Sequence, residues 1–272
     1  IAKVILTIAL FAMGYANRKA LASRDQLRLQ ELLRLISVEA MVMTAVVLMG
    51  SWLSQIQPPA GDTSNLSDAQ LIVGMPTPPP PSLINVLKLY NPDALMIALL
   101  ITAVALYIKG VSVLKSRGDS WPVGRTVAFA SGIALIDFAT SGGLGVYALF
   151  SFEYHMMAHM LLGMIAPIGL VLGAPITLAL RTLPQGRDSE ERGVRALALT
   201  ALHSRYSVIL NNPVTALALF DGSLFILYFT DLFGNLMSNH AGHLFMNIHF
   251  ILAGFLFFHV IIGIDPNPRK YP

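Results

Sequence analysis

The feature that most constrains this chain is a series of apolar stretches, each close to the length of a membrane-spanning helix. Hydrophobic residues make up 55% of the sequence and charged residues 12%, whereas a soluble domain carries roughly 25% charged residues. A helix needs about 20 apolar residues to cross the hydrocarbon of a bilayer. Stretches near this length lie at 1–16, 35–55, 93–113, 125–142, 156–180, 213–233 and 243–264. We therefore expect an all-α, polytopic transmembrane helix bundle with about seven membrane helices.

The two ends of the sequence predict a fragment of a longer protein. The chain opens on Ile1 without an initiator methionine, so its first stretch looks cut short. It stops at Pro272, directly after an apolar stretch. We expect further membrane segments beyond both ends.

The loops between the stretches differ sharply in basic residues. When successive loops alternate between the two sides of a membrane, one side receives all of the 18 Lys and Arg residues except Lys3 and Lys88. Because basic loops stay in the cytoplasm, we expect a multi-pass plasma-membrane protein with its basic loops inside. These residues are spread over helix ends without interleaved aromatic residues. They explain the formal charge of +3 by contact with the lipid bilayer rather than with nucleic acid.

Two segments outside the stretches have distinct patterns. The loop 57–92 contains the run Pro78-Pro79-Pro80-Pro81, which favours extended polyproline II. We therefore expect an external linker at 60–82 between a first unit, 1–59, and a second unit, 83–272. In the segment Glu190 to Leu210, apolar residues recur at helical spacing opposite arginines, which predicts an amphipathic helix at the membrane interface.

Histidine and methionine are concentrated at the outer ends of two apolar stretches. The first cluster is His155-Met156-Met157-Ala158-His159-Met160. The chain has no cysteine, so imidazole and thioether are the donors that it can offer to a soft transition metal. His155 and His159 are four residues apart and therefore project from one face of a helix, a spacing that lets paired histidines grip a metal ion.

The second cluster advances in steps of three residues, through His240, His243, Met246 and His249. Each step drifts by about 60° around a helix, so His243 and His249 lie roughly 120° apart. One helix cannot present all four to a single ion, but two facing helices could supply three or four ligands. We predict a metal site near the external face, with candidate ligands His155, His159, His243, His249, Met156, Met160, Met246 and His240.

The donor types favour copper as the metal. Imidazole suits several late transition metals, whereas thioether adds selectivity for Cu(I). Zinc is the alternative, because the carboxylates of Glu153 and Asp231 are predicted at the same outer level and could complete a harder site. His259 stands alone in the last stretch and is interpreted as a packing residue. The sequence has no glycine-rich phosphate loop, nucleophile elbow or zinc-protease motif, so we do not expect an enzyme.

Both clusters resemble a known family. His155 to Leu162, continued by Ala166-Pro167 and Leu172-Gly173-Ala174-Pro175, is similar to the signature of CtaG, the membrane-integral cytochrome c oxidase assembly factor family. The same holds for Gly242 to Met246, His249 to Gly254 and Gly263 to Pro268, so the resemblance covers roughly residues 83–272. Residues 1–59 resemble the end of a copper resistance D (CopD) membrane domain, through Asn17-Arg18-Lys19, Leu32-Leu33-Arg34 and Val38-Glu39-Ala40. The arrangement resembles actinobacterial fusions of the two domains.

The resemblance implies a plasma-membrane protein that helps to supply copper to a haem-copper cytochrome c oxidase, with the oxidase catalytic subunit as partner. The histidines of the family map onto His155, His159, His243 and His249. Two other classes stay open from the residues. A copper permease predicts ligands across the whole membrane, and a b-type haem protein predicts His159 with His243 or His249 as axial ligands.

Overall fold

The computed structural model describes residues 14, 70, 73–184, 194–237 and 240–267. The helices named below all belong to one compact unit, Ser67–Pro272. The predicted stretches 1–16 and 35–55, the copper resistance D-like segment and the linker up to residue 72 lie outside the described residues, apart from residues 14 and 70.

The named elements of this unit are all helical, as predicted. Within the described ranges, strand-like pairing is limited to an isolated bridge between Tyr90 and Gly142. The helices are α4 (Leu83–Lys88), α5 (Ala94–Ser116), α6 (Val123–Thr140), α7 (Gly143–Ala148), α8 (Phe152–Met160), η1 (Leu161–Ile165), α9 (Ala166–Leu172), α10 (Pro175–Thr182), α11 (Val194–Leu202), α12 (Arg205–Leu210), α13 (Pro213–Leu217), η2 (Ala218–Gly222), α14 (Ser223–Phe229), α15 (Leu232–Met237) and α16 (His240–Ile262).

Four helices are long and apolar enough to cross a membrane, and they coincide with four of the predicted stretches. They are Ala94–Ser116, Val123–Thr140, Phe152–Thr182 and Ala241–Ile262. The stretch predicted at 213–233 forms a shorter apolar helix, Pro213–Phe229, which stops because Thr230 adopts an extended conformation. The predicted count of seven is therefore not confirmed for the part of the chain that the structure describes.

The outward surface of these helices is apolar. Ile101 on α5 and Leu252 on α16 keep 64% and 61% of their surface exposed. Contiguous apolar surface of this kind is rare in water and normal in contact with lipid. The unit is therefore a transmembrane helix bundle.

Close backbone contact joins α6 to α9. A Cβ atom added to Gly132 would lie 2.8 Å from the Ala166 carbonyl oxygen, and one added to Gly169 would lie 2.8 Å from the Ala128 carbonyl oxygen. Because the apolar driving force between helices is lost in lipid, small residues that permit such close packing mark transmembrane interfaces. This contact fixes α9 against α6, and α9 continues through η1 from α8, the helix that carries His155 and His159.

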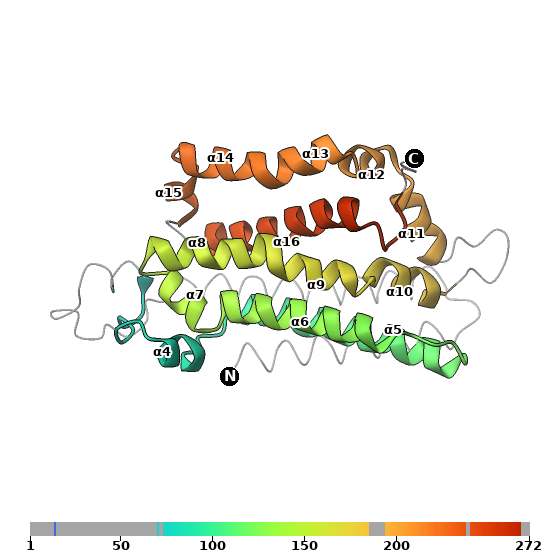
Figure 1. Cartoon of the computed structure of the whole chain (residues 1–272), viewed down its shortest axis with the longest axis horizontal. Coiled ribbons are helices and arrows are strands. Elements are labelled where there is room, and N and C mark those ends of the chain that lie inside the picture. Colours follow the sequence, from blue (N-terminus) through green and yellow to red (C-terminus); the bar gives the residue numbers. More distant parts are fainter. Residues whose placement is uncertain (1–13, 15–69, 71–72, 185–193, 238–239, 268–272) are drawn as a thin grey trace, which may run out of the picture. The chain divides into compact units, whose positions relative to one another are not determined.

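A second close contact brings α16 against η1. Pro167 has no N–H to donate to the carbonyl of Gly163 four residues earlier, and its ring disfavours a regular α-helical turn there. The chain forms the π-helical turn η1 immediately before it, with the Ala166 N–H bonded to the Leu161 carbonyl. A Cβ atom on Gly254 would lie only 2.0 Å from the Gly163 carbonyl oxygen. Glycine at position 254 therefore lets α16 lie directly on η1, between α8–α9 and α13–α14 (Figure 1).

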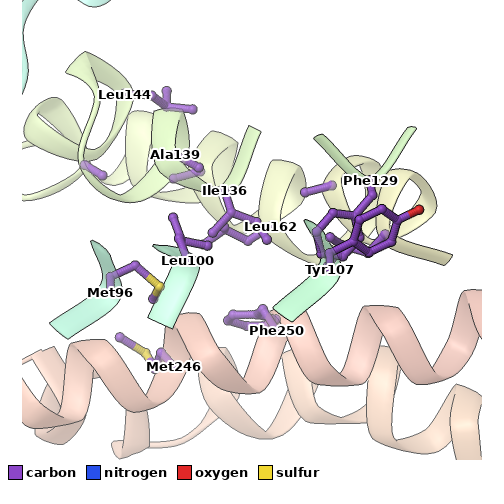
Figure 2. Close-up of a cluster of buried hydrophobic side chains, with 14 of the residues drawn as sticks. Met96, Leu100, Tyr107, Phe129, Ile136, Ala139, Leu144, Leu162, Met246 and Phe250 are labelled. Carbon is purple, nitrogen blue, oxygen red and sulfur yellow. The ribbon is translucent and has the colours of Figure 1, made fainter. Parts of the chain in front are cut away.

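The bundle interior is a continuous apolar cluster. Figure 2 shows Met246 and Phe250 pointing from α16 toward Met96 and Leu100 of α5 and Leu162 of η1. Leu162 has no exposed surface and Met246 has 2%. This cluster lies next to the histidines described below and holds the three helices in register.

The segment predicted as one amphipathic helix, 190–210, is broken. Its first residues lie outside the described part, and the remainder forms α11 and α12. Ser204 separates them because it is extended and its side chain accepts a hydrogen bond from the Ser207 N–H, which makes it the N-cap of α12. The periodic pattern predicted one continuous helix and did not reveal that Ser204 starts a second one.

Candidate metal centre

Three histidines from two helices meet at one end of the bundle. His155 and His159 lie one turn apart on α8, as predicted, and His243 lies in the first turns of α16. One nitrogen from each of the three imidazoles lies within 4.8 Å of the others. We call this group the histidine cluster, and the end of the bundle that holds it the histidine end.

The spacing of these nitrogens suits a single ion after a small contraction. A metal held by imidazoles at about 2.0–2.1 Å needs ligand nitrogens roughly 3.3–3.6 Å apart. The ring centroids of His155 and His159 are 4.1 Å apart, and those of His155 and His243 are 5.8 Å apart. Rotations of the side chains within their helical turns would close the remaining distance.

Buried nitrogens in the cluster are left without a protein partner. His155 and His159 are 2% and 1% exposed. Both ring nitrogens of His155 and the Nε2 of His159 have no hydrogen bond. The Ala148 carbonyl acts on His155 electrostatically but does not meet hydrogen-bond geometry. Because a buried polar atom without a partner costs about 1–3 kcal/mol, this donor set fits a bound cation better than a purely structural role.

Tyr228 on α14 orients one of the three rings. Its hydroxyl shares a hydrogen bond of 2.8 Å with Nδ1 of His159. If Nδ1 carries the proton and donates it to the hydroxyl oxygen, the lone pair of Nε2 faces the cluster. Metal-bound histidines are typically held in this way by their second nitrogen.

Aromatic side chains enclose the cluster. The Phe250 ring lies 4.4 Å from that of His159, and the Phe233 ring lies 5.2 Å from that of His155. Phe152 packs edge-on against Phe233. These rings come from α8, α15 and α16, and they surround the imidazoles with apolar side chains. Sequence reasoning missed Tyr228, Phe233 and Phe250, although a tyrosine in an apolar helix signals a polar partner for its hydroxyl.

His249, a further predicted ligand, does not join the cluster. His249 is half-buried between Phe245 and Phe250, and its Nε2 has no hydrogen bond. It lies outside the group of three, because it follows His243 by six residues and points to a different face of α16. His240 begins α16, but its side chain lies outside the described part.

The predicted sulfur ligands take two different positions. Met246 is buried in the apolar cluster of the bundle. Met156 and Met160 line a pocket on a neighbouring face of α8. Glu153 and Asp231 are exposed, and neither belongs to the ligand group found among the described residues. The two carboxylates that the zinc alternative would use are therefore not part of this group.

Comparison with known proteins places the chain in a family. The sequence model for the cytochrome c oxidase caa3 assembly factor (Caa3_CtaG) matches residues 105–272. Uncharacterized proteins of Mycobacterium bovis and Mycobacterium tuberculosis are each 43% identical to it over 202 residues, which is 74% of this chain and 31% of the relative. A Mycobacterium leprae protein is 41% identical with the same coverage. No solved structure matches the chain.

These matches have a limited extent. The chain spans 31% of the length of the curated relatives, and the family match begins at residue 105. The resemblance of residues 1–59 to a copper resistance D domain stays a prediction. The match includes α8, α16 and all three histidines of the cluster, and the chain belongs to the cytochrome c oxidase caa3 assembly factor family.

Proposed function

We propose that this protein holds a copper ion in the histidine cluster and supplies it to the catalytic subunit of a haem-copper oxidase. The observation that carries the proposal is the convergence of three imidazole nitrogens within 4.8 Å inside an apolar bundle. Membership in an oxidase assembly family supports it, because such a protein acts on the oxidase. Handing over an ion requires ligands that can also release it.

The donor set supports copper over zinc. All three grouped side chains are imidazoles, and no carboxylate joins them in the described part of the chain. Thioether sulfurs from Met156 and Met160 lie on the next face of the same helix. Imidazole with nearby thioether is the combination that favours Cu(I) among the first-row metals.

The distribution of charge supports an external position for the cluster. Among the described residues, every Lys and Arg except Lys88 lies near the opposite ends of the helices or in α11 and α12. Trp121 lies there between Arg125 and Arg181, whose guanidinium carbons are 4.9 and 5.8 Å from its ring centre. Basic residues and an interfacial tryptophan mark a cytoplasmic membrane boundary. We call this the basic end, and we place the histidine end toward the outside.

Neither alternative class gains a supporting observation. A permease needs a relay of ligands through the membrane, but the described residues hold no second group of three His, Cys, Asp or Glu side chains placed to hold an ion. Asp265, the buried acid at the basic end, is occupied in hydrogen bonds to α10. A b-type haem would need His159 and a second histidine as axial ligands on opposite faces of the haem. The ring of His159 instead packs against the rings of His155 and Phe250.

The proposal is tested on the full-length protein purified in detergent after loading with Cu(I). We expect His155→Ala with His159→Ala to lose the copper ion that is held by imidazole nitrogens and to lower oxidase activity when it replaces the wild type in cells. His203→Ala is the matched control, since His203 is exposed in the turn after α11 and its Nδ1 shares a hydrogen bond with the Leu199 carbonyl. Unchanged copper content and oxidase activity in the double variant would remove the site. Copper loss equal to that of the control would do the same.

A further inference from the structure

A second group of metal donors lies beside the histidine cluster, in an apolar pocket of about 820 Å³. Three methionines of α8, Met156, Met157 and Met160, line this pocket. The remaining wall includes Leu83 and Phe138 from α4 and α6. Met157 is 51% exposed, so at least one sulfur can be reached from outside the bundle.

The three methionines form a compact set on one helix. Met156 and Met160 are four residues apart and Met157 and Met160 are three apart, so each pair is adjacent on the helix surface. The whole set covers an arc of about 100°. His155 and His159 occupy the neighbouring arc of the same two turns. The helix therefore carries thioethers on one face and imidazoles on the next.

The pocket chemistry matches a soft monovalent ion. A chain without cysteine has the thioether as its softest donor, and thioethers select Cu(I) over divalent metals. Methionine is unbranched and flexible, so three sulfurs on one face can converge. Leu161 and Ile165 extend the apolar wall along η1, and the side chains that line the pocket include no carboxylate that would favour a harder ion.

We propose that Met156, Met157 and Met160 form a separate Cu(I) acceptor site, which receives the ion and passes it to the histidine cluster. This inference rests on the proposed function of the cluster. In the transfer, Cu–S bonds to the methionines break as Cu–N bonds to His155 and His159 form. Copper stays Cu(I) throughout, so no electron donor or acceptor is needed. Met156 follows His155 in sequence and Met160 follows His159. The ion therefore moves around one helix rather than between distant sites.

The test uses full-length protein in lipid nanodiscs, titrated with Cu(I) from a coloured Cu(I) chelator. The triple variant Met156→Leu, Met157→Leu and Met160→Leu keeps side-chain volume nearly constant. The matched control is Met164→Leu, which changes an exposed methionine four residues beyond Met160 that does not line the pocket. We expect wild type and control to bind about two Cu(I) ions, and the triple variant about one, with slower loading of the histidine cluster.

A complementary variant isolates the pocket. His155→Ala with His159→Ala should retain one Cu(I) or Ag(I) ion with sulfur neighbours in X-ray absorption, and it should not retain Zn(II). Triple-variant stoichiometry and loading rate equal to those of Met164→Leu would overturn this inference while leaving the histidine cluster in place. Wild-type protein that takes up no Cu(I) would overturn the proposed function and this inference together. A thermal unfolding temperature of the triple variant close to that of Met164→Leu would show that the triple variant is folded.

Discussion

The two ends of the bundle treat their buried polar groups in opposite ways. At the basic end, the Trp121 indole donates to the Tyr107 hydroxyl at 3.1 Å, and that hydroxyl donates to the Gly173 carbonyl at 2.9 Å. Asp265 accepts hydrogen bonds from the backbone N–H groups of Ile176 and Thr177, at 3.1 and 2.7 Å. At the histidine end, three imidazole nitrogens of two buried side chains have no protein partner.

The difference separates groups that hold the fold from groups that wait for a ligand. The Asp265 carboxylate caps the start of α10, where Ala174 takes a left-handed conformation with φ of 49° and the chain changes direction. A capping acid is satisfied within the protein. His259 Nδ1 and Arg195 Nε are exceptions at the basic end, since both are also unbonded, but they lie on different elements, α16 and α11. The histidine cluster gathers its unbonded nitrogens at one point.

Removing the Asp265 cap should have the largest effect on stability. Asp265→Ala takes away the acceptor for two backbone N–H groups and for the Thr177 hydroxyl. Hydrogen bonds to a charged group contribute about 1.5–3 kcal/mol each, so we expect a loss of about 3 kcal/mol or more. Thermal unfolding in detergent measures it. Asp119→Ala is the control, because its ion pair with Arg181 is exposed and should change stability by less than about 1 kcal/mol. Equal shifts for both variants would contradict the capping role.

Removing the Tyr228 hydroxyl should weaken copper binding without removing a ligand. Tyr228→Phe keeps the ring that packs near His159 and deletes the 2.8 Å hydrogen bond to its Nδ1. Losing a hydrogen bond that orients a metal ligand lowers affinity by roughly 10–100-fold, which is about 1.4–2.7 kcal/mol. Competition with a Cu(I) chelator measures the affinity. Tyr206→Phe, on the exposed surface of α12, is the control. An affinity equal to that control would mean that Tyr228 does not orient the ring.

Replacing His155 should have the smallest effect on stability, and this result distinguishes the two ends of the bundle most clearly. His155→Leu replaces a buried ring whose two nitrogens lack partners by an apolar side chain. Replacing an unsatisfied buried group by an apolar one is nearly neutral or stabilising. We therefore expect the copper-free protein to change by less than about 1 kcal/mol, or to gain stability, while copper binding falls. Differential scanning of the copper-free protein measures this. A loss comparable to that of Asp265→Ala would make His155 a structural residue.

Much of the fold follows from composition and period. The apolar stretches 93–113, 125–142, 156–180 and 243–264 are the four long membrane-type helices. The facing of His155 and His159 follows from their four-residue spacing. These are local properties of a helix, so the sequence contains them.

The rest depends on contacts between distant segments. The break at Ser204 depends on a side chain that caps in preference to continuing a helix. The partnership of Tyr228 with His159 joins residues 69 positions apart, and no periodic pattern marks it. The kink at Ala174 is held by Asp265, which lies in the segment after α16. The spacing of residues in the sequence determines which face of its own helix a residue occupies. It does not determine which other helix that face contacts.

The π-helical turn η1 has a consequence for how one membrane span serves two tasks. It inserts one extra residue per turn, which offsets the angular phase of everything before it by about 100° relative to everything after it. The imidazole-bearing arc of α8 and the glycine-containing arc of α9 are therefore set independently. Deleting the exposed Met164 here would restore an unbroken spiral and swing the two histidines away from α16, although His155, His159 and the packing glycines would still be present.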